Sequence, residues 1–330
     1  MAHPWELITP FKVSVEQYRS FRRDGFLIVR KLVLPEHVEE IRQFTEDLMH
    51  GRVTVSMAEP PQPNDTPDDR IKRLLRVHML HCESELAERY MLYPRVLDVV
   101  QALTGPDILA LQTMLFIRAP GSEGQGWHQD SYYIPTFPDS LLGAWIAVDP
   151  VDEENGCMFM LPGSNHEPIY PPKSGHGYGD WGLKDIPEVS GVGGHSNSDE
   201  DPQNELNPIV KSQQASPIAC VMEPGDVAFF GGHILHRSYS NRSTDRMRRA
   251  FVNHYCNARS FTPWLDGNKS HILARGNTTL GFAQPRFGTP CSALNPQKSI
   301  SDRGSVPDMM LGDEDGMMSP GQPSATPDPH

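Results

Sequence analysis

An imidazole and a carboxylate lie two residues apart at His128 and Asp130, within a Trp-His-Gln-Asp-Ser segment. If this segment is extended, alternate side chains point to the same face, so the two groups project together. A histidine and a carboxylate are suitable metal ligands, but a chain with 14 histidines often contains such a pair by chance. Taken alone, the pair is more simply explained as two polar residues of an exposed loop.

Two more histidines, His233 and His236, follow a short apolar strand that begins after a Pro-Gly turn at Pro224. Either histidine could complete a set of two imidazoles and one carboxylate. Such a set is the facial triad of non-haem Fe(II) oxygenases, which leaves coordination positions open for other ligands. We expect His233 to be an ordinary hydrogen-bonded histidine of the fold, which leaves His236 as the candidate ligand.

An arginine-rich segment follows at residues 246–253. In a strand, Arg248 would share a face with Ala250 and Val252, whereas Arg249 would point to the other face. A charge on an otherwise small, apolar face is costly inside a barrel unless an anion meets it, and a guanidinium binds a carboxylate with two parallel hydrogen bonds. The alternative is a solvated basic turn. Combined with the three candidate metal ligands, Arg248 indicates a 2-oxo acid held between iron and arginine.

Short strands separated by turns must position these groups. Apolar segments that alternate with Pro-Gly and Asn-Gly turns lie at residues 108–117, 141–148, 157–161, 218–222, 227–230 and 249–255. Helices are expected after a capping box at Ser14 and Gln17, from Pro35 to Leu48, and near 80–91 and 94–103. This pattern predicts a mainly β fold with flanking helices, either a β-sandwich or a jelly-roll barrel.

We expect one domain over residues 1–293. Within it, the polar stretch 171–217 is too long for an ordinary connection and is predicted to be a lid or a mobile insertion. Residues 294–330 are acidic and rich in proline, which predicts a disordered tail.

Composition excludes several classes of protein. The 330 residues carry 42 acidic and 29 basic side chains, a net charge of −13, so broad attraction to nucleic acid or to an anionic membrane is not expected. The 31 prolines argue against a helical bundle. Five scattered cysteines form no C-x-x-C pair, and no signal peptide or apolar run of about 18 residues is evident. We therefore expect a cytoplasmic protein.

The sequence resembles the phytanoyl-CoA dioxygenase family of Fe(II)- and 2-oxoglutarate-dependent oxygenases over about residues 14–260. Ordered motifs carry the resemblance, at 24–29, 104–106, 127–130, 143–145, 155–157, 161–164 and 236–248. It implies a double-stranded β-helix, the cupin-like jelly-roll barrel. It also implies that His128, Asp130 and His236 bind Fe(II) and that Arg248 holds 2-oxoglutarate. Further contacts to 2-oxoglutarate are implied for Met114, Trp145, Ser238 and Arg76, the last at a position where the family's best-known member has a lysine.

The implied reaction consumes O₂ and decarboxylates 2-oxoglutarate to succinate and CO₂ while a small organic metabolite is hydroxylated. Desaturation, epoxidation and ring closure use the same chemistry, whereas the presence of Asp130 disfavours halogenation. Tyr132 and Tyr133 could line the pocket, and no basic patch stands out to meet the phosphates of a CoA thioester. Two other hypotheses are a cupin-type metalloenzyme that does not use 2-oxoglutarate, which would have no use for Arg248, and a non-catalytic jelly-roll binding protein.

Overall fold

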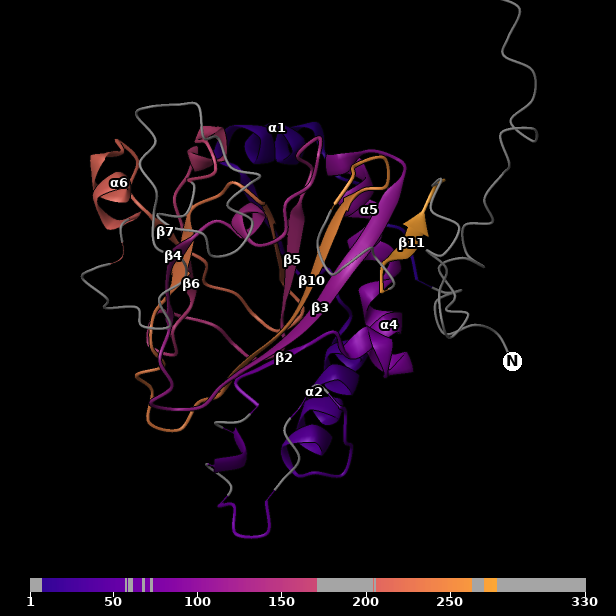
Figure 1. The fold of residues 1–330 in the computed structure, drawn as a ribbon, viewed down its shortest axis with the longest axis vertical. Coiled ribbons are helices and arrows are strands. Elements are labelled where there is room, and N and C mark those ends of the chain that lie inside the picture. The colour runs from indigo at the N-terminus through magenta and orange to yellow at the C-terminus, as the bar shows by residue number, and fades with distance from the viewer. Residues whose placement is uncertain are drawn as a thin grey trace, which may run out of the picture. The chain divides into compact units, whose positions relative to one another are not determined.

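Two antiparallel β-sheets form the centre of the fold (Figure 1). The computed structural model describes residues 8–56, 58, 62–66, 69–71, 74–170, 204, 206–262 and 270–277, all within the unit Met1–Asn295. The larger sheet has the order β1 (Phe26–Val29), β8 (Val227–Gly231), β5 (Leu142–Ala147), β10 (Arg248–Asn257), β3 (Ile108–Arg118) and β11 (Ile272–Arg275), with β2 (Arg76–His78) also paired to β3. The smaller sheet has the order β4 (Gln125–His128), β9 (His236–Ser238), β6 (Met158–Met160) and β7 (Ile218–Ala219).

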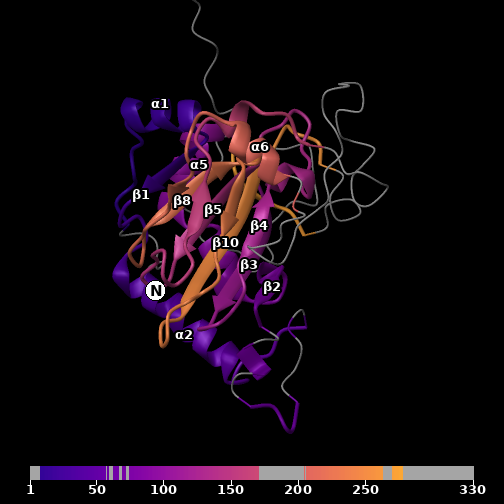
Figure 2. The ribbon, with the colours of Figure 1, turned by 90° about the vertical axis from the view of Figure 1, so that its left-hand side faces the viewer.

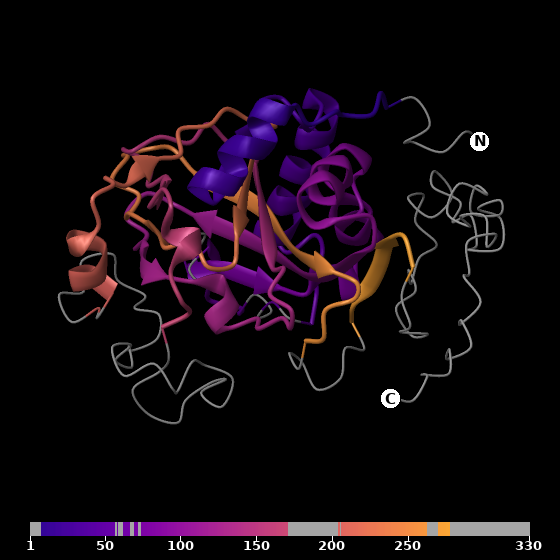
Figure 3. The same cartoon turned by 90° about the horizontal axis from the view of Figure 1, so that it is seen from above.

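The larger sheet separates two layers of the core. Figure 2 shows its strands side by side from β1 to β2. Side chains alternate along each strand, so on β10 Phe251 and Tyr255 pack towards the helices while Ala250 and Val252 face the smaller sheet. The helical side is covered by α2 (Pro35–Met49), α4 (Glu85–Met91) and α5 (Pro94–Thr104), as Figure 3 shows from above. The space between the two sheets therefore holds a separate apolar cluster, which includes Met114, Trp145 and Phe230.

The helices begin where their sequences predict. In α1 (Val15–Asp24), Ser14 Oγ accepts from the Gln17 amide at 3.1 Å and Gln17 Oε1 accepts from the Ser14 amide at 2.9 Å. This capping box was expected, and Gly25 ends the helix with φ of 83°. Pro35 and Pro94 occupy the first turns of α2 and α5.

One predicted helix is divided. The segment expected to be helical over 80–91 forms a 3₁₀ turn, η1 (Leu80–Cys82), followed by α4. Ser84 begins α4, since its side chain accepts from the Ala87 amide. A serine directly before Glu85 is a capping signal that could have located this break. The remaining elements are the 3₁₀ turns η2 (Asp130–Tyr132) and η3 (Ser164–His166) and the helix α6 (Leu206–Ser212).

The predicted fold class is confirmed: the protein is mainly β, with flanking helices and the two facing sheets of a jelly roll. Among the described strands no ladder joins the two sheets, so they face each other across a gap that side chains fill. Within the same residues, no helix is long and apolar enough to cross a membrane. Most of the predicted lid, residues 171–203 and 205, and all of the predicted tail lie outside the described residues. The predicted lid and the domain boundary at 293 stay predictions.

Candidate metal centre and anion site

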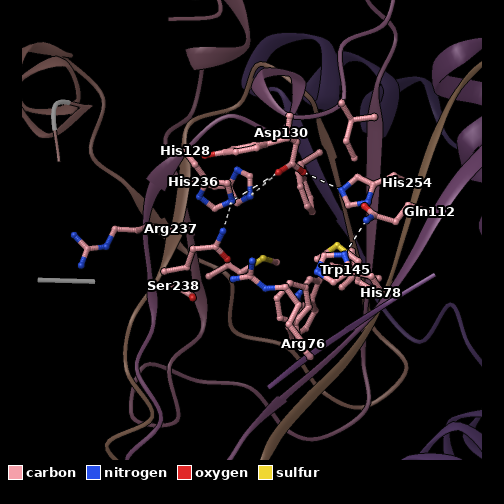
Figure 4. A pocket seen from close by; sticks show the side chains of 18 of the residues that line it. Arg76, His78, Gln112, His128, Asp130, Trp145, His236, Arg237, Ser238 and His254 are labelled. Carbon is pink, nitrogen blue, oxygen red and sulfur yellow. Dashed lines mark hydrogen bonds and ion pairs between the residues drawn. The ribbon is translucent and has the colours of Figure 1, made fainter. Parts of the chain in front are cut away.

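A cavity of about 380 Å³ lies between the two sheets (Figure 4). Side chains from both sheets line it, so its shape depends on how the sheets face each other. The residues that line it include Arg76, His78, Gln112, Met114, Phe116, Arg118, Gln125, His128, Asp130, Tyr133, Trp145, His236, Ser238, Arg248, Val252 and His254.

The two candidate histidine ligands come from neighbouring strands of the smaller sheet. His128 at the end of β4 and His236 at the start of β9 are paired across the ladder, and their ring centroids are 3.9 Å apart. Gly124, just before β4, allows this close pairing, because a Cβ there would lie 2.1 Å from the carbonyl oxygen of Ser238. The approach of β4 to β9 therefore depends on a glycine.

Asp130 joins the two histidines from a turn. The strand ends at His128, and Asp130 begins η2, so the expected extended segment continues only to Gln129, whose φ is −124° and ψ is 130°. The Oδ1 atom of Asp130 lies 3.7 Å from Nε2 of His128 and 3.7 Å from Nε2 of His236. One ligand atom from each of the three residues lies within 4.8 Å of the others. This spacing suits a single metal ion.

Hydrogen bonds fix the tautomer of both histidines. Nδ1 of His128 donates to the carbonyl of Gly126 at 2.9 Å, and Nδ1 of His236 donates to the carbonyl of Ile234 at 3.1 Å. A carbonyl can only accept, so each Nδ1 carries the proton and each Nε2 presents a lone pair. Carbonyl partners of this kind orient metal-binding histidines in many proteins. The amide of Gln125 lies 3.2 Å from Nε2 of His128.

His254 holds the other oxygen of the carboxylate, a contact that sequence reasoning missed. Its Nε2 lies 3.1 Å from Oδ2 of Asp130, and its side chain is 5% exposed (Figure 4). Burial raises the pKa of Asp130, but the positive charge that His236 carries in its protonated form and the hydrogen bond from His254 outweigh it and hold that pKa well below its usual range. The two-residue alternation that places Arg248, Ala250 and Val252 on one face of the strand continues to His254. The sequence therefore did indicate that His254 shares this face.

Arg248 enters the cavity as the alternation predicted. It is 3% exposed, and its guanidinium lies 5.9 Å from the ring centroid of Trp145. Burial, and then the charge of Arg118, lower the pKa of Arg248 to about 9. Arg249 points to the opposite face, where it forms ion pairs with Asp149 at 2.8 Å and with Glu46. Of these two neighbouring arginines, only Arg248 is therefore available to a ligand in the cavity.

The other residues expected to contact 2-oxoglutarate all line the same cavity: Met114, Trp145, Ser238 and Arg76. Met114 on β3 and Trp145 on β5 flank Val252 of β10 in register. Arg76, on β2, is partly buried, and burial lowers its pKa. Figure 4 shows it on the opposite side of the cavity from Asp130.

Two further expectations concern residues near the metal motif. His233 is bonded away from the ligand set, with Nδ1 donating to the carbonyl of Glu167 at 2.7 Å and Nε2 lying 3.3 Å from Asp139. The expectation that it is an ordinary histidine of the fold agrees with these contacts. Tyr133 lines the cavity, whereas Tyr132 is not among the lining residues.

Comparison with known sequences identifies the relatives of this chain. The sequence model described as Phytanoyl-CoA dioxygenase (PhyH) matches residues 21–250. The rat protein named Phytanoyl-CoA dioxygenase, peroxisomal, is 27% identical over 289 residues, which cover 84% of this chain and 77% of the rat protein. The Caenorhabditis elegans protein named Probable phytanoyl-CoA dioxygenase is 28% identical over 259 residues, which cover 74% and 76%.

Solved structures share the fold at lower identity. EctD from S. alaskensis, solved with 2-oxoglutarate and 5-hydroxyectoine, has a TM-score of 0.56 and 16% identity, with 78% of this chain and 80% of EctD covered. The epimerase SnoN, solved with Fe3+, alpha ketoglutarate and nogalamycin RO, has a TM-score of 0.53 and 19% identity, with 74% and 84% covered. At these identities the likeness concerns the fold alone.

Proposed function

The chain belongs to the phytanoyl-CoA dioxygenase family and is a 2-oxoglutarate-dependent dioxygenase, and on that basis we propose that it hydroxylates a small organic metabolite. One observation supports the proposal most strongly. Three metal-ligand atoms and a buried arginine with no carboxylate partner among the described residues line one cavity between the sheets. The first group suits a metal and the second suits an organic acid.

The ligand set of His128, Asp130 and His236 fits Fe(II). Two imidazole Nε2 atoms and one carboxylate oxygen are the donors of the facial triad, and the carbonyl bonds to both Nδ1 atoms keep the Nε2 lone pairs available. Asp130 stays ionised, so the site offers one negative charge to the metal. When bound, iron supplies the oxidising chemistry that couples decarboxylation of 2-oxoglutarate by O₂ to oxygen insertion into a C–H bond.

We assign Arg248 as the anchor of 2-oxoglutarate. A guanidinium binds a carboxylate with two parallel hydrogen bonds, and the low exposure of Arg248 would exclude water from that pair. Met114 and Trp145 would pack against the carbon chain, and Ser238 would add a hydroxyl donor. We keep Arg76 as a weaker candidate for this co-substrate. The chain's own part is to orient the co-substrate, compensate its charge and exclude water.

A small substrate agrees with the size of the cavity. Its volume of about 380 Å³ lies near the lower end of the range of about 300 to 1,000 Å³ for ligand pockets, and 2-oxoglutarate would occupy part of it. Relatives are named for phytanoyl-CoA, but the volume of the cavity among the described residues agrees better with a smaller substrate. The cytoplasm remains our proposed location, although the rat relative is named peroxisomal.

The proposal is tested by following 2-oxoglutarate in the purified, Fe(II)-loaded protein under air. We expect slow, iron-dependent formation of succinate and CO₂ even without substrate, and faster formation when a suitable metabolite is added. Asp130→Ala should abolish the formation of succinate. Asp139→Ala, which removes a carboxylate bonded to His233, should leave succinate formation intact. Succinate formation that is independent of iron, or absent with saturating iron, would contradict the proposal.

A further inference from the structure

A row of three polar side chains crosses the cavity at the end where Asp130 lies. His254 on β10 and Gln112 on β3 are direct partners across the strand ladder, and His78 lies on β2, which pairs with the other edge of β3. All three line the cavity, and Figure 4 shows them on the opposite side of it from the two metal histidines. His254 is bonded to Asp130, whereas neither the metal nor the co-substrate accounts for Gln112 and His78.

Gln112 and His78 form a hydrogen-bonded pair. Nε2 of Gln112 donates to Nδ1 of His78 at 2.9 Å. An amide nitrogen can only donate, so Nδ1 accepts and the imidazole carries its proton on Nε2. Burial, and then the charge of Arg76, lower the pKa of His78 to about 4, which agrees with a neutral ring. The pairing therefore fixes the tautomer of His78.

The pair keeps one donor and one acceptor unused. Nε2 of His78 and Oε1 of Gln112 have no hydrogen-bond partner among the described residues. Both atoms keep some exposed surface, and both side chains line the cavity. Water can meet these atoms in an empty cavity, but a ligand that displaces the water must replace both hydrogen bonds. The pair therefore selects ligands that can accept from His78 and donate to Gln112.

The co-substrate occupies a different part of the cavity. Arg248 and His254 lie on the same face of β10, six residues apart, which corresponds to about 20 Å along an extended strand. 2-Oxoglutarate bound between Arg248 and the metal fills the space towards Arg248. Gln112 is paired with His254, so it and His78 lie at the other end. This end is left for the primary substrate.

The chemistry of the pair favours a neutral partner. Asp130 is the only acidic residue among the described residues that line the cavity, and its two oxygens face the metal histidines and His254. Gln112 and the neutral ring of His78 carry no charge. An ionised group buried against them would lose its hydration without gaining a countercharge. A hydroxyl or a carboxamide is a better match, because each is neutral and both accepts and donates.

We propose that His78 and Gln112 recognise a hydroxyl or carboxamide group of the primary substrate. Nε2 of His78 donates to the oxygen of this group, and Oε1 of Gln112 accepts its proton in a second hydrogen bond. The inference rests on the proposed function, because it gives the Arg248 end of the cavity to 2-oxoglutarate. The two hydrogen bonds fix the orientation of the substrate and so determine which of its carbon atoms lies nearest the metal.

The test uses the full-length protein with Fe(II) and 2-oxoglutarate in the absence of O₂. Calorimetry measures the binding of cyclohexanol, piperidin-2-one and cyclohexanone, which are rings of similar size, while the visible charge-transfer band reports that 2-oxoglutarate stays bound. The first two probes accept and donate, whereas the ketone only accepts. We expect at least one of the first two to bind about tenfold more tightly than the ketone, which leaves Oε1 of Gln112 unpaired. The tighter of the two identifies the group as a hydroxyl or a carboxamide.

Variants then locate the preference. Gln112→Met removes the acceptor and should abolish the preference over the ketone. His78→Leu removes the donor and should weaken the binding of all three probes about tenfold. His78→Gln should recover part of that loss, because its amide can accept from Gln112 and donate to the probe. Gln43→Met is the matched control, since Gln43 lies on α2 and bonds to Asp47. All four variants should keep 2-oxoglutarate affinity close to that of the wild type.

Three outcomes would overturn the inference. The first is that the wild-type complex binds cyclohexanone as tightly as both of the other probes. The second is that the preference persists in Gln112→Met. The third is that cyclohexanecarboxylate binds more tightly than every neutral probe, which would show that a charge such as that of Arg76 selects the substrate. Failure of the proposed function looks different, because the charge-transfer band would then be absent before any probe is added.

Discussion

Asp130 and His254 are joined by a hydrogen bond of 3.1 Å between Oδ2 of the carboxylate and Nε2 of the imidazole. The other oxygen, Oδ1, lies 3.7 Å from Nε2 of both His128 and His236. The carboxylate therefore has one oxygen held by the larger sheet and one directed at the metal position. His254 is a positioning residue, since it acts on the metal only through Asp130.

Removing this hydrogen bond should weaken metal binding. We expect His254→Ala to lower Fe(II) affinity by about 10- to 100-fold, because the carboxylate loses the partner that fixes its orientation. His254→Gln, whose amide can donate to Asp130, should recover part of the loss. His233→Gln is the matched control, because His233 bonds to Glu167 and Asp139 instead. Fe(II) affinity is measured by anaerobic titration. If His254→Ala leaves this affinity unchanged, His254 does not position Asp130 for the metal.

The two adjacent arginines of β10 should respond in opposite ways. Arg249→Met removes a buried partner of Asp149 and should lower the free energy of unfolding by about 3 kcal/mol, with little change in 2-oxoglutarate affinity. Arg248→Met should leave stability unchanged or raise it, because an unpaired buried charge is removed, and should weaken 2-oxoglutarate binding about 100-fold. Urea unfolding and anaerobic titration measure the two effects. A stability loss in Arg248→Met as large as that in Arg249→Met would show that the face assignment is wrong.

Gly124 offers a test of how the sheets bring the two histidines together. A Cβ at this position would lie 2.1 Å from the carbonyl oxygen of Ser238, and backbone cannot move aside as a flexible side chain can. Gly124→Ala should push β4 away from β9 and lower Fe(II) affinity by about tenfold. Gly121→Ala is a useful comparison, since no atom lies within 4 Å of a Cβ there, although its φ of 78° adds backbone strain. Equal Fe(II) affinity in the wild type and in Gly124→Ala would show that the close approach is not needed.

Metal binding should depend on pH through the histidines alone. Imidazoles bind metal in their neutral form, so Fe(II) affinity should fall by about tenfold or more between about pH 8 and about pH 5. Asp130 adds nothing to this loss, because its pKa lies well below the usual range and the carboxylate stays ionised throughout. Anaerobic competition with a chelator measures the affinity at each pH. A flat profile would contradict the assignment of His128 and His236 as ligands.

Local patterns predicted much of the fold and part of the site. Alternation along residues 246–253 correctly separated the inward face of Arg248 from the outward face of Arg249, because a strand has a strict two-residue period. The same period reached His254, but nothing near it in the sequence indicated a partner. Its partner Asp130 is 124 residues away.

The pairings between distant strands could not be predicted from the sequence. Arg118 looks like the unremarkable end of an apolar strand until the register of β3 and β10 places it opposite Arg248. Similarly, the His-x-Asp motif did not indicate that Asp130 leaves the strand to begin a turn. The structure supplied these relationships because β3 and β10 are far apart in the sequence, so no short turn between them indicates their register.

The central claim is that one cavity holds Fe(II) on three side chains and 2-oxoglutarate on Arg248. The most direct test is to add Fe(II) and then 2-oxoglutarate to the protein without O₂ and to record the weak visible metal-to-ligand charge-transfer band. We predict that the band appears in the wild-type protein, vanishes in Asp130→Ala, and in Arg248→Ala requires a 2-oxoglutarate concentration about 100-fold higher. A protein that binds Fe(II) but gives no band, or a band that Arg248→Ala leaves unchanged, would contradict the account.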